Sequence, residues 1–142
     1  GLQFTSNYVE IEYIIYFRGE KQDYMPSHPT VPVSYLKYTV NDAVDLGNYT
    51  AFYPNCDFEG WVNANGEAVT NISAGTVGDI QLSAKWEQHK VNVRYVSNAS
   101  DDVNNLPENH IFNYYDILDL PMDLPRKGNS YRRVFDYWWT LY

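Results

Sequence analysis

The segment 38–86 constrains the fold more than any other part of the chain. Between residues 80 and 87 apolar and polar side chains alternate strictly, and this period-two pattern is typical of a half-buried β-strand. Asn65-Gly66 is a strong hairpin signal, because a two-residue type I′ turn needs positive φ at both central residues. Short strands are expected on either side of that turn, at 58–63 and 67–72. The segment is therefore predicted to be one compact β unit.

The glycines Gly75 and Gly78 of this segment raise the question of a phosphate-binding loop. The sequence around them lacks the Lys-Ser/Thr ending of such a loop, and no helical pattern follows it. The residues 73–79 are therefore predicted to form a turn between two strands.

The preceding residues are less regular. A first alternation over 9–17 predicts an opening strand. Residues 19–34 carry three prolines, which block a central strand and favour an extended segment. Such a stretch is either a long connection or a binding loop. The β character resumes over 35–46, where Asn41 is expected to open a short helical turn because Asn and Asp cap helices well.

The apolar alternation starts again later in the chain. Residues 91–95 repeat the pattern of residues 9–13, 82 positions earlier, and the Phe-Asp-Tyr-Trp run at 135–138 echoes Phe-Glu-Gly-Trp at 58–61, 77 positions earlier. A shared period of roughly eighty residues favours a tandem repeat. We therefore expect one module over 1–88, with the proline-rich loop as an insertion, and a second, degenerate or truncated module over 89–142.

Three motifs of the first module together resemble a known family. Phe58-Glu-Gly-Trp61, Gly75-Thr-Val-Gly-Asp79 and Leu82-Ser-Ala-Lys-Trp86 are similar to the Phe-x-Gly-Trp strand, the Gly-Asp turn and the closing Leu-Tyr-Ala-x-Trp strand of the Listeria–Bacteroides repeat, also called the internalin-type B repeat. Ser83 stands where the family usually has Tyr. The proline-rich loop replaces the Asn-Gly-Gly turn that follows the first strand of the family.

In the second module the resemblance is looser. Residues 118–121 and 126–128 are similar to the Leu-Pro and Arg-x-Gly segments of the family, and Tyr137 replaces the Gly of the Phe-x-Gly-Trp strand. The resemblance implies a mainly β chain made of small α+β modules with a β-grasp-like fold. The second of the two modules is expected to be irregular. It assigns to the core the following residues: Phe58, Gly60, Trp61, Leu82, Trp86 and Trp138.

The composition narrows the range of partners. The net charge of −8 at pH 7 would repel a phosphate backbone, so nucleic acid is not expected as a partner. No run approaches the roughly 20 apolar residues of a membrane span. The single cysteine, Cys56, allows no internal disulfide, which fits a cytosolic protein or a bacterial surface protein. Gly1 in place of Met suggests a trimmed chain from which a leader has been removed.

Residues capable of chemistry are scattered. His28, His89 and His110 share no ligand spacing and no calcium-loop motif occurs, so neither a metal nor another cofactor is expected. The carboxylates of residues 10 and 12 share one strand face, but nothing marks a cleft there. Cys56 is interpreted as a small half-buried residue rather than a nucleophile. We therefore expect no catalytic residue and no enzymatic activity.

The aromatic residues near the C-terminus are the sharpest functional lead. Aromatic residues make up 17% of the chain, and 14 of them are Tyr. One interpretation is packing in the core and along an edge strand. The other is an exposed platform that stacks on sugar rings or on a partner protein. The candidate binding residues are Tyr24, His28, Tyr114, Tyr115, Tyr137, Trp139 and Tyr142.

The sequence thus predicts a non-enzymatic module of a bacterial cell-surface or secreted protein. Members of the family it resembles act as spacers or protein-interaction units, and pairing at a sheet edge is one way to bind a protein partner. The alternative is a carbohydrate-binding module that uses exposed Trp and Tyr. The expected location is extracellular, and the expected partner is a protein or a surface glycan.

Overall fold

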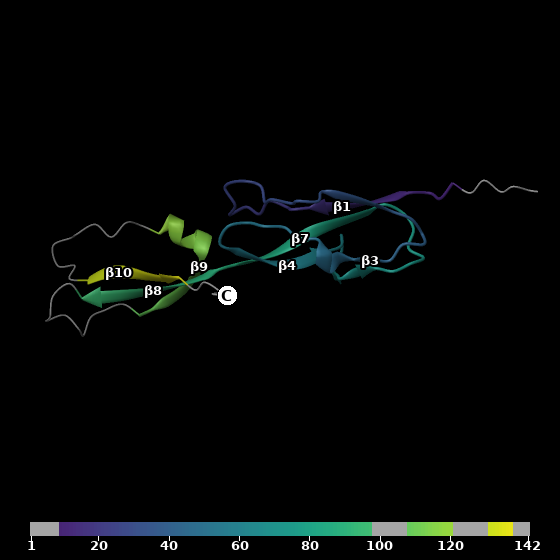
Figure 1. The fold of residues 1–142 in the computed structure, drawn as a ribbon. Coiled ribbons are helices and arrows are strands. Elements are labelled where there is room, and N and C mark those ends of the chain that lie inside the picture. The colour runs from purple at the N-terminus through teal and green to yellow at the C-terminus, as the bar shows by residue number, and fades with distance from the viewer. Residues whose placement is uncertain (1–8, 98–107, 121–130, 138–142) are drawn as a thin grey trace, which may run out of the picture. The chain divides into compact units, whose positions relative to one another are not determined.

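The computed structural model describes residues 9–97, 108–120 and 131–137 (Figure 1). The predicted mainly β class is confirmed. The described chain divides into two compact units. Unit 1 comprises residues up to 21, 27–53 and 58–86, and unit 2 comprises 22–26, 54–57 and the residues from 87 onward. The assignment of two repeat-like modules, at 1–88 and 89–142, stays a prediction.

Unit 1 is built on a five-stranded sheet with the strand order β2-β1-β7-β4-β5. Its strands are β1 (Tyr13–Arg18), β2 (Tyr35–Tyr38), β4 (Cys56–Val62), β5 (Ala68–Val69) and β7 (Ile80–Gln88). Residues 56–57 of β4 and 87–88 of β7 are counted with unit 2. β1 pairs antiparallel with β2 on one side and parallel with β7 on the other. The first and last strands of this mixed sheet, β1 and β7, are therefore parallel neighbours.

A second, two-stranded sheet accompanies the first. It pairs β3 (Val44–Asp45) with β6 (Asn71–Ile72), and the 3-10 helix η1 (Leu46–Asn48) follows β3 directly. Within the described residues no helix is long and apolar enough to cross a membrane.

The opening strand is shorter than predicted. β1 begins at Tyr13, which lies opposite Tyr38, the last residue of β2. The two apolar side chains before it, Val9 and Ile11, are 87% and 67% exposed. The alternation at residues 9–12 therefore does not mark a strand, because the neighbouring strand β2 ends at the level of Tyr13.

The Asn65-Gly66 turn also differs from the prediction. In the pairing of β4 with β5, Asn63 and Glu67 flank a loop of three residues. The N–H of Asn63 donates to the carbonyl of Glu67 at 2.9 Å and closes this loop. Gly66 has a positive φ of 79°, whereas Asn65 does not. A type I′ turn needs both, so the predicted turn type is wrong. The side chain of Asn63 holds the loop by accepting the N–H groups of Asn65 and Glu67.

The predicted helical turn forms later than expected. The helical turn in this segment is η1, which begins at Leu46 and not at Asn41. The carboxylate of Asp45 caps it by accepting the N–H of Gly47 at 2.9 Å. Asp42 instead accepts the N–H of Thr39 at 2.8 Å, and a local bond of this kind competes with a helix. The return strand expected at 67–72 is likewise divided, since β5 pairs with β4 whereas β6 pairs with β3.

The core of unit 1 lies against β1 and β7. Ile15 and Leu82 have no exposed surface, and Phe17 and Trp61 are each 3% exposed. The ring of Phe17 lies between Tyr49, at 5.0 Å, and Trp61, at 4.9 Å between centroids. Burial of side chains of this size stabilises a fold by about 1.5–3 kcal/mol each. The alternation predicted for β7 is therefore confirmed as a half-buried strand.

Unit 2 is built around β8 (Lys90–Ser97), which lies between β9 (His110–Asn113) and β10 (Tyr131–Tyr137) (Figure 1). Both neighbours pair antiparallel with β8. The 3-10 helix η2 (Tyr114–Asp119) follows β9. Val91 and Val93 have no exposed surface, and Met25 is 1% exposed. The alternation that begins at residue 91 thus marks a strand with one buried face, as predicted.

Candidate functional site

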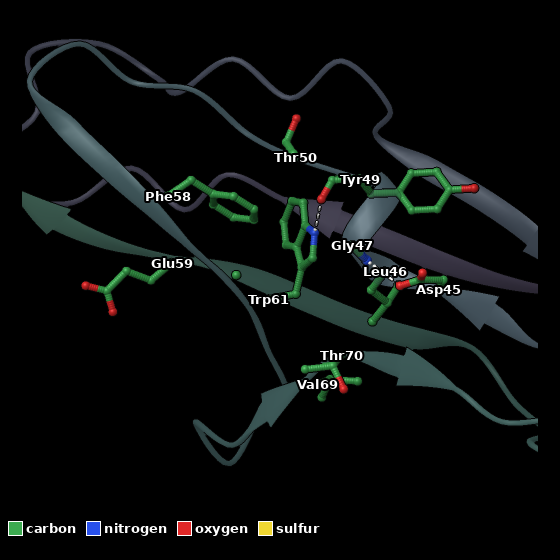
Figure 2. Close-up of a pocket in the computed structure, with 11 residues that line it drawn as sticks. Asp45, Leu46, Gly47, Tyr49, Thr50, Phe58, Glu59, Trp61, Val69 and Thr70 are labelled. Carbon is green, nitrogen blue, oxygen red and sulfur yellow. Dashed lines mark hydrogen bonds between the residues drawn. The ribbon is translucent and has the colours of Figure 1, made fainter. Parts of the chain in front are cut away.

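A groove of about 370 Å³ opens in unit 1 between β4 and the segment that contains η1 (Figure 2). Its volume falls within the roughly 300–1,000 Å³ typical of small-molecule sites. The residues that line it are Asp45, Leu46, Gly47, Tyr49, Thr50, Phe58, Glu59, Gly60, Trp61, Val69 and Thr70.

The base of the groove is formed by Trp61. Its indole Nε1–H donates to the carbonyl of Tyr49 at 2.9 Å, the bond drawn dashed in Figure 2. Phe58 lies beside it, with the two ring centroids 5.1 Å apart. Because Trp61 is only 3% exposed, its ring face is taken up by the core and is not free to stack on a ligand. Trp61 therefore closes the groove rather than serving as a binding platform.

Two carboxylates lie at the groove, and each already has a partner. Asp45 accepts the N–H of Gly47. Glu59 points away from Trp61 in Figure 2 and lies 3.9 Å from the ammonium group of Lys85. Both side chains are exposed to solvent. The groove thus presents an apolar base with a polar rim, which suits holding an apolar group better than acid–base chemistry.

The family resemblance assigns six residues to the core, and all of them that the structure describes lie in unit 1. Leu82 and Trp61 are buried, and Phe58 and Trp86 are half-buried against the core. The indole Nε1–H of Trp86 donates to the carbonyl of Gly19 at 2.9 Å. Trp138 lies outside the described residues.

Gly60 is needed for its backbone conformation. Its φ is +117°, a region that residues with a side chain rarely adopt. A Cβ at this position would meet no atom within 4 Å. A glycine in the Phe-x-Gly-Trp strand is expected to allow either a close approach of the backbone or a bulge; the open space around Gly60 argues against the close approach.

Unit 2 brings together four of the candidate binding tyrosines. The ring of Tyr115 lies 5.5 Å from Tyr24 and 5.0 Å from Tyr114, and Tyr137 lies 6.0 Å from Tyr114. Tyr137 is 42% exposed, but Tyr115 is 9% exposed and its hydroxyl donates to the carbonyl of Pro54 at 2.7 Å. The placement of Tyr115 in an exposed platform is therefore wrong, because its ring and its hydroxyl are both engaged inside unit 2.

The remaining candidate binding residues are not part of this group. His28 is exposed and belongs to unit 1. Trp139 and Tyr142 lie outside the described residues.

Cys56 is buried beside Tyr24. Burial raises the pKa of the Cys56 thiol, and a hydrogen bond with Tyr24 acts in the opposite direction. Burial also raises the pKa of Tyr24 above its ordinary value, and the adjacent thiol adds to the effect. Both groups are therefore protonated at neutral pH. A protonated thiol is a weak nucleophile, which agrees with the interpretation of Cys56 as a small packed residue.

Sequence reasoning missed two tyrosines that support the groove and the core. Tyr49 provides the carbonyl that holds Trp61, and Tyr53 is 3% exposed and accepts the N–H of Ser27 at 3.2 Å. Both lie in the segment 48–55, which the sequence predicts only as irregular. Their aromatic character within a polar segment was the available signal.

The comparisons with known proteins add no further assignment. Neither protein-family models, nor curated proteins, nor solved structures match the chain. Within the described residues no group of three or more His, Cys, Asp or Glu side chains is placed to hold a metal ion. The resemblance to the Listeria–Bacteroides repeat therefore stays a prediction based on its motifs.

Proposed function

We propose that the chain is a non-enzymatic spacer and protein-interaction module of a bacterial cell-surface or secreted protein. The observation that carries this proposal is the location of the signature aromatic residues. Phe58 packs against both Trp61 and Trp86, and both indole N–H groups donate to backbone carbonyls. The residues that give the chain its motif thus serve the fold, as expected for a module whose task is to be a stable body between other parts.

The edge of the five-stranded sheet is the surface through which such a module would bind a protein. β2 is an edge strand, and an edge strand offers unpaired backbone groups to an extended segment of a partner. Tyr35 within it is 55% exposed, and Val33 and Val40 on either side are 39% and 40% exposed. These side chains would supply apolar contacts beside the backbone pairing.

Carbohydrate binding is the second candidate, and one observation favours it. Tyr137 is 42% exposed and lies beside Tyr114, with ring centroids 6.0 Å apart. Tyr114 is half-buried, so the exposed ring of Tyr137 is the one that can stack on a sugar ring.

A glycan array separates the two functions. The spacer proposal predicts that the wild-type chain binds no class of sugar on the array. The Tyr137→Ala variant should give the same result. Retention of one sugar class that is lost in Tyr137→Ala, but kept in the exposed-tyrosine control Tyr35→Ala, would favour the carbohydrate function and contradict the spacer proposal.

The proposed location has a separate test. Antibodies raised against the chain are expected to label intact cells of the source organism. Labelling that requires permeabilisation of the cells would contradict an extracellular location.

A further inference from the structure

The two central strands of unit 1 are arranged so that tension along the chain loads them in shear. β1 and β7 are parallel neighbours, aligned from Ile15 opposite Ile80 to Arg18 opposite Ser83. The chain enters this pair at the first residue of β1 and leaves it at the last residue of β7. Tension therefore pulls β1 toward its N-terminal end and β7 toward its C-terminal end. Since the strands run in the same direction, these pulls slide one along the other and load all their hydrogen bonds together.

Two side-chain hydrogen bonds bracket this parallel pair. At one end the carboxylate of Asp79, immediately before β7, accepts the N–H of Ile14 at 2.9 Å. At the other end the indole of Trp86 donates to the carbonyl of Gly19, immediately after β1, at 2.9 Å. Each bond joins segments more than 60 residues apart in sequence, so each resists the sliding of β1 past β7.

One face of the pair is also shielded from water. Ile15 and Leu82 have no exposed surface and Phe17 is 3% exposed. A hydrogen-bonding group that is left unpaired on this buried side is costly, so the burial adds to the resistance of the pair against sliding.

Unit 2 has the opposite geometry. β8 and β10 are antiparallel, with Val91 opposite Tyr137 and Ser97 opposite Tyr131. The chain enters β8 and leaves β10 at the same end of the pair. Tension there would separate the strands one residue pair at a time, starting from that end.

We infer that unit 1 is a load-bearing element, with β1 and β7 forming a shear clamp and Asp79 and Trp86 fastening its two ends. This mechanical function deepens the proposed spacer role. It is tested by force, whereas the spacer role is tested by glycan binding and by location, so the failure of one can be told from the failure of the other.

Single-molecule pulling along two axes tests the clamp. In the first experiment the handles are attached at positions 12 and 87, and tension shears β1 against β7. In the second they are attached at positions 12 and 40, at the same end of the antiparallel β1–β2 pair, and tension peels it. Forced unfolding follows the unfolding rate along the pulled axis, so we expect at least about a twofold higher force for the shear axis at one loading rate. Equal forces along both axes would overturn the inference.

A pair of matched tryptophan variants tests the fastening at Trp86. In both Trp86→Phe and Trp61→Phe an aromatic ring is kept and one indole N–H bond of 2.9 Å to a backbone carbonyl is lost. Only the bond of Trp86 joins the β7 strand to the end of β1. Trp86→Phe is expected to lower the unfolding force along the 12–87 axis more than Trp61→Phe does. An equal or smaller loss in Trp86→Phe would show that this bond does not carry load.

A pair of carboxylate variants tests the other end. Asp79 and Asp45 each accept one backbone N–H at 2.9 Å. Asp79→Ala is expected to lower the unfolding force along the 12–87 axis, whereas Asp45→Ala, whose bond only caps η1, leaves it nearly unchanged. The reverse order would contradict the assignment of Asp79.

Discussion

The opening strands of the two units follow the same apolar alternation but have different surroundings. β1 and β8 each have a neighbour on both sides in their sheets. Each pairs antiparallel with the next strand along the chain, β1 with β2 and β8 with β9. On the other side β1 has a parallel neighbour, β7, whereas β8 has an antiparallel one, β10. A parallel neighbour requires a long crossover connection, while an antiparallel one does not. The same local pattern is thus compatible with two sheet topologies.

Burial also refines the comparison of the two strands. The buried pair Ile15 and Phe17 of β1 corresponds to the buried pair Val91 and Val93 of β8, 76 positions later. The sequence pattern alone matches the strand starts at a spacing of 82. The value of 76 lies closer to the spacing of 77 between the two Phe-x-x-Trp runs. The tandem repeat, with its period of roughly eighty residues, stays a prediction.

The largest expected difference between the units comes from Trp61→Ala. The side chain is 3% exposed and packs against Phe17 and Phe58, so its loss should cost unit 1 about 3–5 kcal/mol. Urea titration followed by pulse proteolysis, with cleavage sites assigned by mass spectrometry, measures each unit separately. The urea midpoint of unit 2 should stay unchanged. An equal shift of the midpoint in both units would show that they unfold as one.

Val93→Ala is the corresponding change in unit 2. The side chain has no exposed surface in the centre of β8. Loss of its two methyl groups should cost about 1.5 kcal/mol, with the same proteolysis assay as the measurement. A midpoint shift confined to cleavage sites of unit 1 would contradict the division into units.

Alkaline pH should distinguish the units as well. In unit 2 burial raises the pKa of Cys56 above its ordinary 9.0, whereas in unit 1 burial raises the pKa of Tyr38 above its ordinary 10.0. Each raised pKa gives stability that is complete below the unfolded value and is lost as pH rises above it, because the unfolded chain then releases the proton first. Unit 2 should therefore begin to lose stability near pH 9, and unit 1 only near pH 10.

Urea midpoints measured between pH 7 and 10.5 check this order. Cys56→Ala removes the thiol. The pH at which unit 2 begins to lose stability should therefore rise toward the range in which Tyr24 titrates. An unchanged onset in this variant would show that the thiol does not set it.

The smallest expected effects come from the surface ion pairs. Glu59 and Lys85 in unit 1 lie 3.9 Å apart, whereas Arg94 and Asp136 in unit 2 form a hydrogen-bonded pair of 2.7 Å between β8 and β10. Glu59→Gln should cost less than about 0.5 kcal/mol and Asp136→Asn up to about 1 kcal/mol. Thermal melts at low and at 1 M salt measure both changes, and high salt should reduce the cost of Asp136→Asn.

Part of the candidate site was predictable and part was not. Leu82 and Trp86 lie on the apolar side of a clear period-two pattern, which predicts that they face the core. The core position of Trp61 was expected from the family resemblance, and the structure buries it. Tyr115 was misplaced because an aromatic residue looks the same in sequence whether it packs inside or stacks outside. Only its contact with Pro54 decides between the two. The groove was not foreseen because its walls come from segments that no local pattern joins.

The sequence by itself determined the β class, the half-buried strands β7 and β8, and the aromatic residues available for a core. These follow from side-chain alternation, which is a local property. Only the tertiary structure decided which strands are neighbours, the parallel direction of β7 beside β1, and the contacts that bind Trp86 to Gly19 and Asp79 to Ile14. Pairing of this kind joins residues more than 60 positions apart, so it depends on how the whole chain packs and not on any one segment.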